Sequence, residues 1–207
     1  MKSVIASLGL LVLVVLQPQS IAKHTQAENA APKSVGYSEV VDRAFQFSRG
    51  IPAEFSEMDY RIVVRFLPSW GPESQIVFLR NKDRTFRVID YRLKKGTRPI
   101  SEEYNEVVRN NPNASVEDVL KRITVEITEE RPDESKARLV EQFFRLSIPT
   151  DIDPDLCLDG TTYHLWVQTQ SNSIQASLSD CSYGKNSDST PILRWMKAVQ
   201  KESRKGD

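Results

Sequence analysis

Residues 157–195 read CLDGTTYHLWVQTQSNSIQASLSDCSYGKNSDSTPILRW, and this stretch decides the fold. Apolar and polar residues alternate over residues 161–169 and again over residues 173–179, with a polar turn at residues 170–172 between the two runs. Alternation with a period of two is typical of strands that bury one face. The stretch therefore predicts a β-hairpin, followed by a closing helix that starts at Pro191.

The two cysteines of the chain, Cys157 and Cys181, flank this hairpin. Folding the hairpin brings the two positions within a few residues of each other. An even number of cysteines favours a disulfide in an oxidising compartment. We therefore predict an intrachain Cys157–Cys181 disulfide, which closes a loop of about 25 residues and contributes about 3 kcal/mol through chain entropy. The alternatives are two free thiols, or a nucleophilic Cys157 beside His164.

The start of the chain indicates such a compartment, because residues 1–22 have the pattern of a secretory signal peptide. Lys2 precedes an apolar run over residues 4–16, in which Ser7 is the one hydroxyl residue. The small residues Ser20 and Ala22 occupy the positions that a signal peptidase reads. The run is shorter than the about 20 residues that span a bilayer. We expect cleavage after Ala22, export to the periplasm or the outside of the cell, and no transmembrane span afterwards. A retained N-terminal anchor is the alternative.

The strands of the early half follow the same alternating pattern as the hairpin. Strand-like runs at residues 59–67, 75–80 and 85–93 are separated by short polar turns, which favours an antiparallel meander. Residues 23–36 precede this region and are polar, Ala-rich and without periodicity, so we expect a disordered lead there. Residues 37–207 are then predicted to form a single domain.

Helical spacing of apolar residues appears before and after the meander. It predicts helices over residues 37–49, 101–110, 115–123 and 133–146. Residues 124–130 alternate and fit either a strand or the end of the preceding helix. The predicted fold class is α+β: an antiparallel sheet, made of a three-stranded meander and the C-terminal hairpin, covered by helices.

Five residues are candidates for binding. His164, Trp166 and Gln168 line up on one face of the first hairpin strand, and aromatic residues are enriched at contact surfaces. Arg61 and Arg65 share one face of the first meander strand, and their guanidinium groups suit an anionic ligand or an acidic partner. The alternative interpretations are a packed sheet histidine and arginines that are solvated or paired within the molecule.

We predict no metal site and no cofactor. His164 is the only histidine after the lead, and a single imidazole cannot build a multi-histidine zinc site. The chain contains no phosphate-binding GxxxxGK, no GxSxG, no HExxH and no CxxC. Four acidic residues match positions of a calcium loop, but Leu156 replaces its turn glycine and Thr162 its last glutamate. The four residues are Asp151, Asp153, Asp155 and Asp159.

Charge is balanced overall and uneven along the chain. The 28 basic and 28 acidic side chains cancel, so net charge gives no argument for nucleic acid. Residues 59–98 carry ten basic and four acidic side chains, whereas residues 101–159 carry seven and fifteen. These runs either face solvent as a basic and an acidic surface, or pair with each other inside the molecule.

These observations predict a small exported binding protein without catalytic activity, such as an inhibitor, an immunity factor or an envelope accessory protein. Its partner would be another exported protein or a component of the envelope. One alternative is an exported hydrolase that uses a carboxylate pair such as Glu103 and Asp159, since such a pair leaves no sequence motif. The other is a binder of small anionic ligands that uses the arginine face.

Overall fold

The computed structural model describes residues 35–47, 57–146, 160–170, 172–181 and 190–204, with only the backbone described at Cys181. All of these residues belong to the compact unit Pro32–Asp207. The predicted signal peptide and most of the predicted lead lie outside the described residues. Among the residues described, no helix is both long and apolar enough to cross a membrane.

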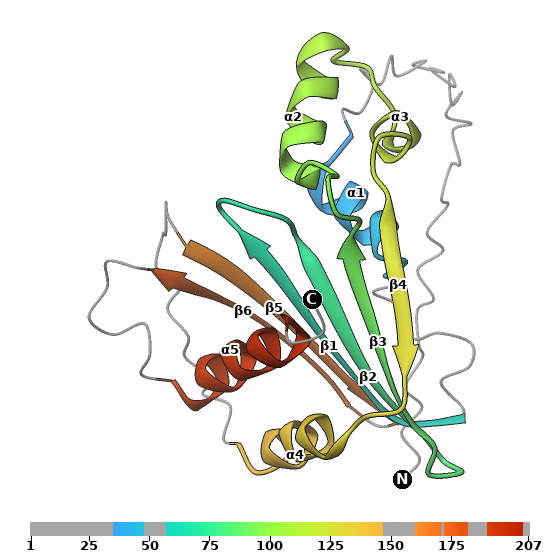
Figure 1. The fold of residues 1–207 in the computed structure, drawn as a ribbon, viewed down its shortest axis with the longest axis vertical. Helices are drawn as coiled ribbons and strands as arrows, with labels where there is room; N and C mark the ends of the chain where they lie inside the picture. Colours follow the sequence, from blue (N-terminus) through green and yellow to red (C-terminus); the bar gives the residue numbers. More distant parts are fainter. Residues whose placement is uncertain (1–34, 48–56, 147–159, 171, 182–189, 205–207) are drawn as a thin grey trace, which may run out of the picture. The chain divides into compact units, whose positions relative to one another are not determined.

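Six strands form one antiparallel sheet within the described part of the chain, which confirms the α+β class. Their order across the sheet is β4-β3-β2-β1-β5-β6 (Figure 1). Of residues 124–130, which fit either a strand or a helix end, residues 125–130 form a strand that pairs with residues 88–93. The strands are β1 (Met58–Pro68), β2 (Ser74–Asn81), β3 (Phe86–Leu93), β4 (Val125–Glu130), β5 (Gly160–Thr169) and β6 (Ser173–Cys181).

Five helices accompany the sheet in the described residues: α1 (Tyr37–Ala44), α2 (Ile100–Asn110), α3 (Val116–Leu120), α4 (Glu134–Phe143) and α5 (Pro191–Ser203). Ser115 and Asp118 form a capping box at the start of α3, and Asp133 caps α4. The predicted end of the first helix at residue 49 is wrong. The helix stops at Ala44, and Gln46 adopts a φ of 50°, a left-handed conformation that cannot continue a right-handed helix.

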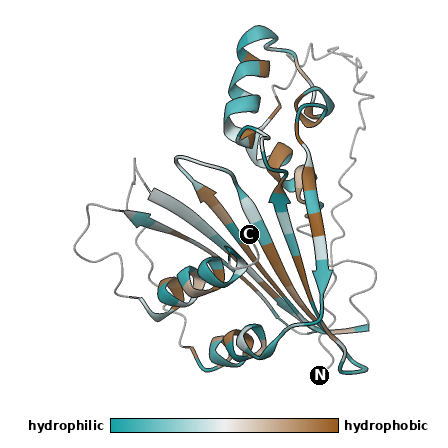
Figure 2. Cartoon of the chain, viewed as in Figure 1, coloured by the Kyte–Doolittle hydropathy of each residue, from teal (hydrophilic) through white to brown (hydrophobic). Residues whose placement is uncertain are grey.

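Helices cover both faces of the sheet. The even-numbered residues of β1, such as Ile62 and Val64, pack with α4 and α5, which lie side by side (Figure 1). On the opposite face Val63 packs in a second core cluster with apolar residues of α1, α2 and α3. Figure 2 shows the resulting hydrophobic bands along the central strands. The face of β1 that carries Arg61 and Arg65 is therefore buried as well.

Candidate functional site

The register between β1 and β5 brings the five predicted binding residues together. Arg61 lies opposite Gln168, and Arg65 lies opposite His164. Trp166 lies between them, opposite Val63. Paired residues of antiparallel strands share a face, so all five side chains lie on the α1 side of the sheet. We call them, with the two phenylalanines that follow α1, the arginine–aromatic cluster: Phe45, Phe47, Arg61, Arg65, His164, Trp166 and Gln168.

Arg65 lies at the centre of this cluster and is only 2% exposed. Its Nη1 donates to Asp42 Oδ1 at 2.7 Å, and its Nε and Nη2 donate to Gln75 Oε1 at 3.1 and 2.9 Å. The guanidinium carbon lies 4.9 Å from the ring centroids of both Phe47 and Trp166. A buried charge needs such partners. The contacts join α1 to the sheet, and they correspond to the ion-paired alternative for this arginine.

His164 is the one member of the cluster that is not buried. Trp166 is 7% exposed, and its ring centroid lies 4.5 Å from that of Phe47. His164 is half-buried and stacks on Trp166 at 5.5 Å and 17°. The β6 residues opposite them, Gln175 and Ser177, are exposed. The accessible edge of the cluster is therefore polar, and whether it binds a partner stays a prediction.

Trp70 is a candidate that the sequence analysis missed. It is the most exposed large apolar residue of the described chain, at 83%, and it lies in the turn between β1 and β2. Gly71 in the same turn adopts a φ of 110°. The Ser69 N–H donates to Gly160 O at 2.7 Å and ties the turn to the start of β5. The signal for this residue is its position among turn formers, Pro68-Ser69-Trp70-Gly71-Pro72, which predicts a tryptophan outside the core.

A cavity of about 520 Å³ begins at Pro72, two residues after Trp70. Lys95 and Arg204 lie exposed on its wall, and Glu73 is buried in it. The Glu73 carboxylate accepts hydrogen bonds from the N–H groups of residues 100 and 101, at 2.8 and 2.9 Å, and from Tyr37 Oη at 2.9 Å. Burial, followed by the neighbouring Glu73, raises the pKa of Tyr37 far above its ordinary value. Glu73 thereby caps α2 from the distant turn that precedes β2.

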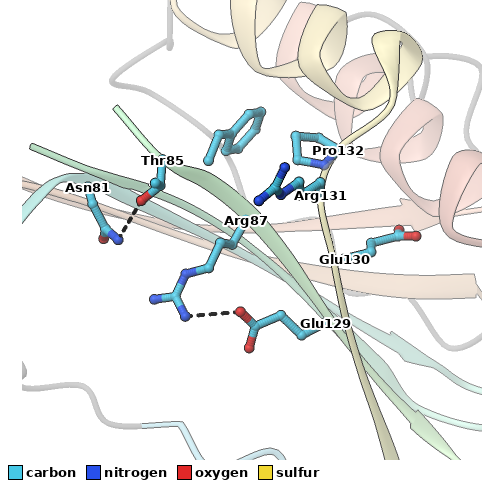
Figure 3. A pocket seen from close by; sticks show the side chains of 8 residues that line it. Asn81, Thr85, Arg87, Glu129, Glu130, Arg131 and Pro132 are labelled. Carbon is cyan, nitrogen blue, oxygen red and sulfur yellow. Dashed lines mark hydrogen bonds and ion pairs between the residues drawn. The ribbon is translucent and has the colours of Figure 1, made fainter. Parts of the chain in front are cut away.

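A second cavity, of about 840 Å³, lies where β3 and β4 part (Figure 3). The ladder between the two strands ends at Val88 and Glu130. Arg87 lines this cavity, and its Nη1 donates to Glu129 Oε1 at 3.0 Å. Like Arg65, it has a carboxylate partner within the molecule. Arg87 belongs to the basic segment and Glu129 to the acidic segment, so this ion pair matches the alternative in which the two segments pair with each other inside the molecule.

The carboxylates of α2 are also paired with arginines. Glu103 Oε1 lies 3.3 Å from Arg98 Nη1, and its Oε2 lies 3.5 Å from Arg122 Nη1. Hydrogen bonds from Arg98 and Arg122 hold the pKa of Glu106 below its ordinary value. Asp159, the other half of the predicted carboxylate pair, lies outside the described residues. Within the described ranges, no group of three or more His, Cys, Asp or Glu side chains is placed to hold a metal ion.

The predicted disulfide falls at the edge of what the structure describes. Cys157 and the aspartates of the calcium-like loop lie outside the described residues. The backbone of Cys181 pairs with Gly160, which is three residues after Cys157. The disulfide stays a prediction that this pairing favours.

Comparison with known proteins adds no relative from which a role could be transferred. No protein-family model matches the chain, and neither the curated proteins nor the solved structures give a significant match. The class of protein is therefore given by its architecture, an α+β protein with a six-stranded antiparallel sheet in its described part.

Proposed function

We propose that the protein is an exported, non-catalytic binding protein that recognises another exported protein through the surface around Trp70. The exposure of Trp70 carries this proposal. Tryptophan is among the residue types most enriched at binding hot spots, where it buries a large apolar area. The Ser69–Gly160 hydrogen bond and the flanking Pro68 and Pro72 restrain the turn, so that binding costs little conformational entropy.

The pairing of charges inside the molecule supports binding over the two alternatives. Glu103, one carboxylate of the hydrolase alternative, contacts two arginines. Arg65, which was a candidate for an anionic ligand, and Arg87 each contact a carboxylate. Ion pairs of this kind stabilise the charged forms and occupy the donors that a ligand would need.

The single domain, the export and the disulfide that the sequence predicts are also part of this proposal. The meander of β1, β2 and β3 and the hairpin of β5 and β6 are proposed to be parts of a single domain that spans residues 37–207. Residues 1–22 are proposed to direct export, after which the Cys157–Cys181 disulfide forms in the periplasm or outside the cell. The Gly160–Cys181 backbone pair supports this bond.

The test compares the unmodified protein with Trp70→Ala after gentle purification from its own secretory route. Ile174→Ala is the matched control, because Ile174 is also an exposed apolar residue but lies on the edge strand β6. Native mass spectrometry should find a second protein with the unmodified chain and with the control, but not with Trp70→Ala. A partner that Trp70→Ala retains would contradict the role of Trp70. A hydrolytic activity on envelope polymers that Glu103→Gln abolishes would favour the hydrolase instead.

A further inference from the structure

A groove of about 400 Å³ lies between the end of α4 and the first turns of α5. Figure 1 shows these two helices next to each other on one face of the sheet. Trp195 forms part of the groove wall, and its Nε1 donates to Leu139 O of α4 at 2.7 Å. This bond fixes the indole ring in place. The other residues of the wall are Gln142, Arg145, Leu146, Pro191, Arg194 and Ala198.

The groove is positively charged. Arg145 and Arg194 are both exposed, and neither forms an ion pair with any residue that the structure describes. No carboxylate from the described ranges lines the groove. An anion bound in the groove would be attracted by both guanidinium groups. The arrangement differs from Arg65 and Arg87, which have carboxylate partners.

The start of α5 adds to this preference for an anion. Arg194 lies in the first turns of the 13-residue helix, where the helix dipole disfavours a positive side chain. Thr190 is the N-cap residue, but its side chain makes no capping hydrogen bond. Its Oγ1 is buried and has no hydrogen-bond partner in the described part of the chain. Pro191 has no N–H, and the Arg194 N–H donates to Thr190 O at 3.2 Å. The N–H groups of Ile192 and Leu193 therefore receive no acceptor from the cap side chain, and such groups bind anions.

We propose that this groove binds a small apolar carboxylate. The carboxylate lies between Arg145 and Arg194 at the start of α5, and the apolar body packs against Leu146, Trp195 and Ala198. A volume of about 400 Å³ is in the range of small-ligand pockets. Such a group comes either from a free organic acid or from the C-terminal residue of a peptide.

The test titrates the full chain with four probes by isothermal calorimetry at low salt. Octanoate represents a free acid, N-acetylphenylalanine represents a peptide C-terminus, and its amide is the neutral analogue. Inorganic phosphate tests charge without an apolar body. Both carboxylates should bind at least about tenfold more tightly than the amide and the phosphate, since hydrogen bonds to a charged group are the stronger ones. The tighter of the two carboxylates identifies the source of the natural ligand.

Arg145→Gln and Arg194→Gln should each weaken carboxylate binding about tenfold. Arg109→Gln is the matched control, because Arg109 is an exposed arginine at the end of α2. Circular dichroism and the thermal midpoint establish that the variants fold. The proposal is wrong if neither carboxylate binds at millimolar concentration, if the amide binds as tightly, or if Arg109→Gln weakens binding equally. Because the groove is independent of Trp70, the binding of a partner protein can fail its test without affecting this one.

Discussion

Arg65 of β1 donates a hydrogen bond to Asp42 of α1 at 2.7 Å, and this ion pair holds the first helix on the sheet. The Arg65 side chain is 3% exposed and that of Asp42 is 17% exposed. Gln75 links the same guanidinium to the backbone after α1, because its Nε2 donates to Phe45 O at 3.3 Å. One buried arginine thus connects β1, β2 and the end of α1.

We expect Asp42→Ala to destabilise the protein by about 3 kcal/mol, because the substitution leaves the buried Arg65 charge without its carboxylate. Urea denaturation measures the loss. Arg43→Ala is the control, since the Arg43–Glu117 pair is more than half exposed and should contribute less than about 1 kcal/mol. Equal losses for the two variants would contradict a special role for the buried pair.

The sequence predicted the strands well because their pattern is local. Alternation identified β1, β2, β3, β5 and β6 within a few residues, and Ser115 and Pro191 marked two helix starts. The pattern over residues 37–49 predicted too long a helix, because the helical spacing of apolar residues continues through Phe45 and Phe47. The positive φ of Gln46 ends the helix there, and a single glutamine gives no signal for it.

The arrangement of the candidate site was not predictable from the same patterns. Arg65 and His164 are separated by almost a hundred positions, and only the pairing of β1 with β5 makes them neighbours. Strand register of this kind depends on packing across the whole sheet. The cap of α2 is a second example. Ile100 N–H binds the distant Glu73 carboxylate, whereas α2 has no capping side chain in its own sequence.

Glu73→Ala should destabilise the protein by about 3 kcal/mol, because two backbone N–H groups and the Tyr37 hydroxyl lose their acceptor. Thermal and urea denaturation measure the loss. Glu126→Ala on β4 provides the control, since Glu126 is exposed and lines the same cavity as Glu73. If both variants retain full stability, the proposed capping of α2 by Glu73 is not important for folding.

The cap of α3 should depend on pH. Hydrogen bonds from Lys121, and then from the backbone and side chain of Ser115, hold the pKa of Asp118 well below its ordinary value. A carboxyl group whose pKa is lower in the folded state stabilises the protein above its unfolded pKa, about 4, and loses this effect as the pH falls. Asp118→Asn should therefore lower the thermal midpoint at pH 7. The difference from the unmodified protein should shrink as the pH falls below 4, and a constant difference would contradict the assignment.

We expect Cys157 and Cys181 to be joined by a disulfide in the mature protein. The mature protein should have a mass two hydrogens below that of the reduced chain, and neither cysteine of the unfolded, unreduced protein should react with iodoacetamide. Because the bond restricts the unfolded chain, reduction should cost about 3 kcal/mol of stability. The double variant Cys157→Ser/Cys181→Ser should have the same stability with and without reductant. Reaction of both thiols in the unreduced protein would contradict the disulfide.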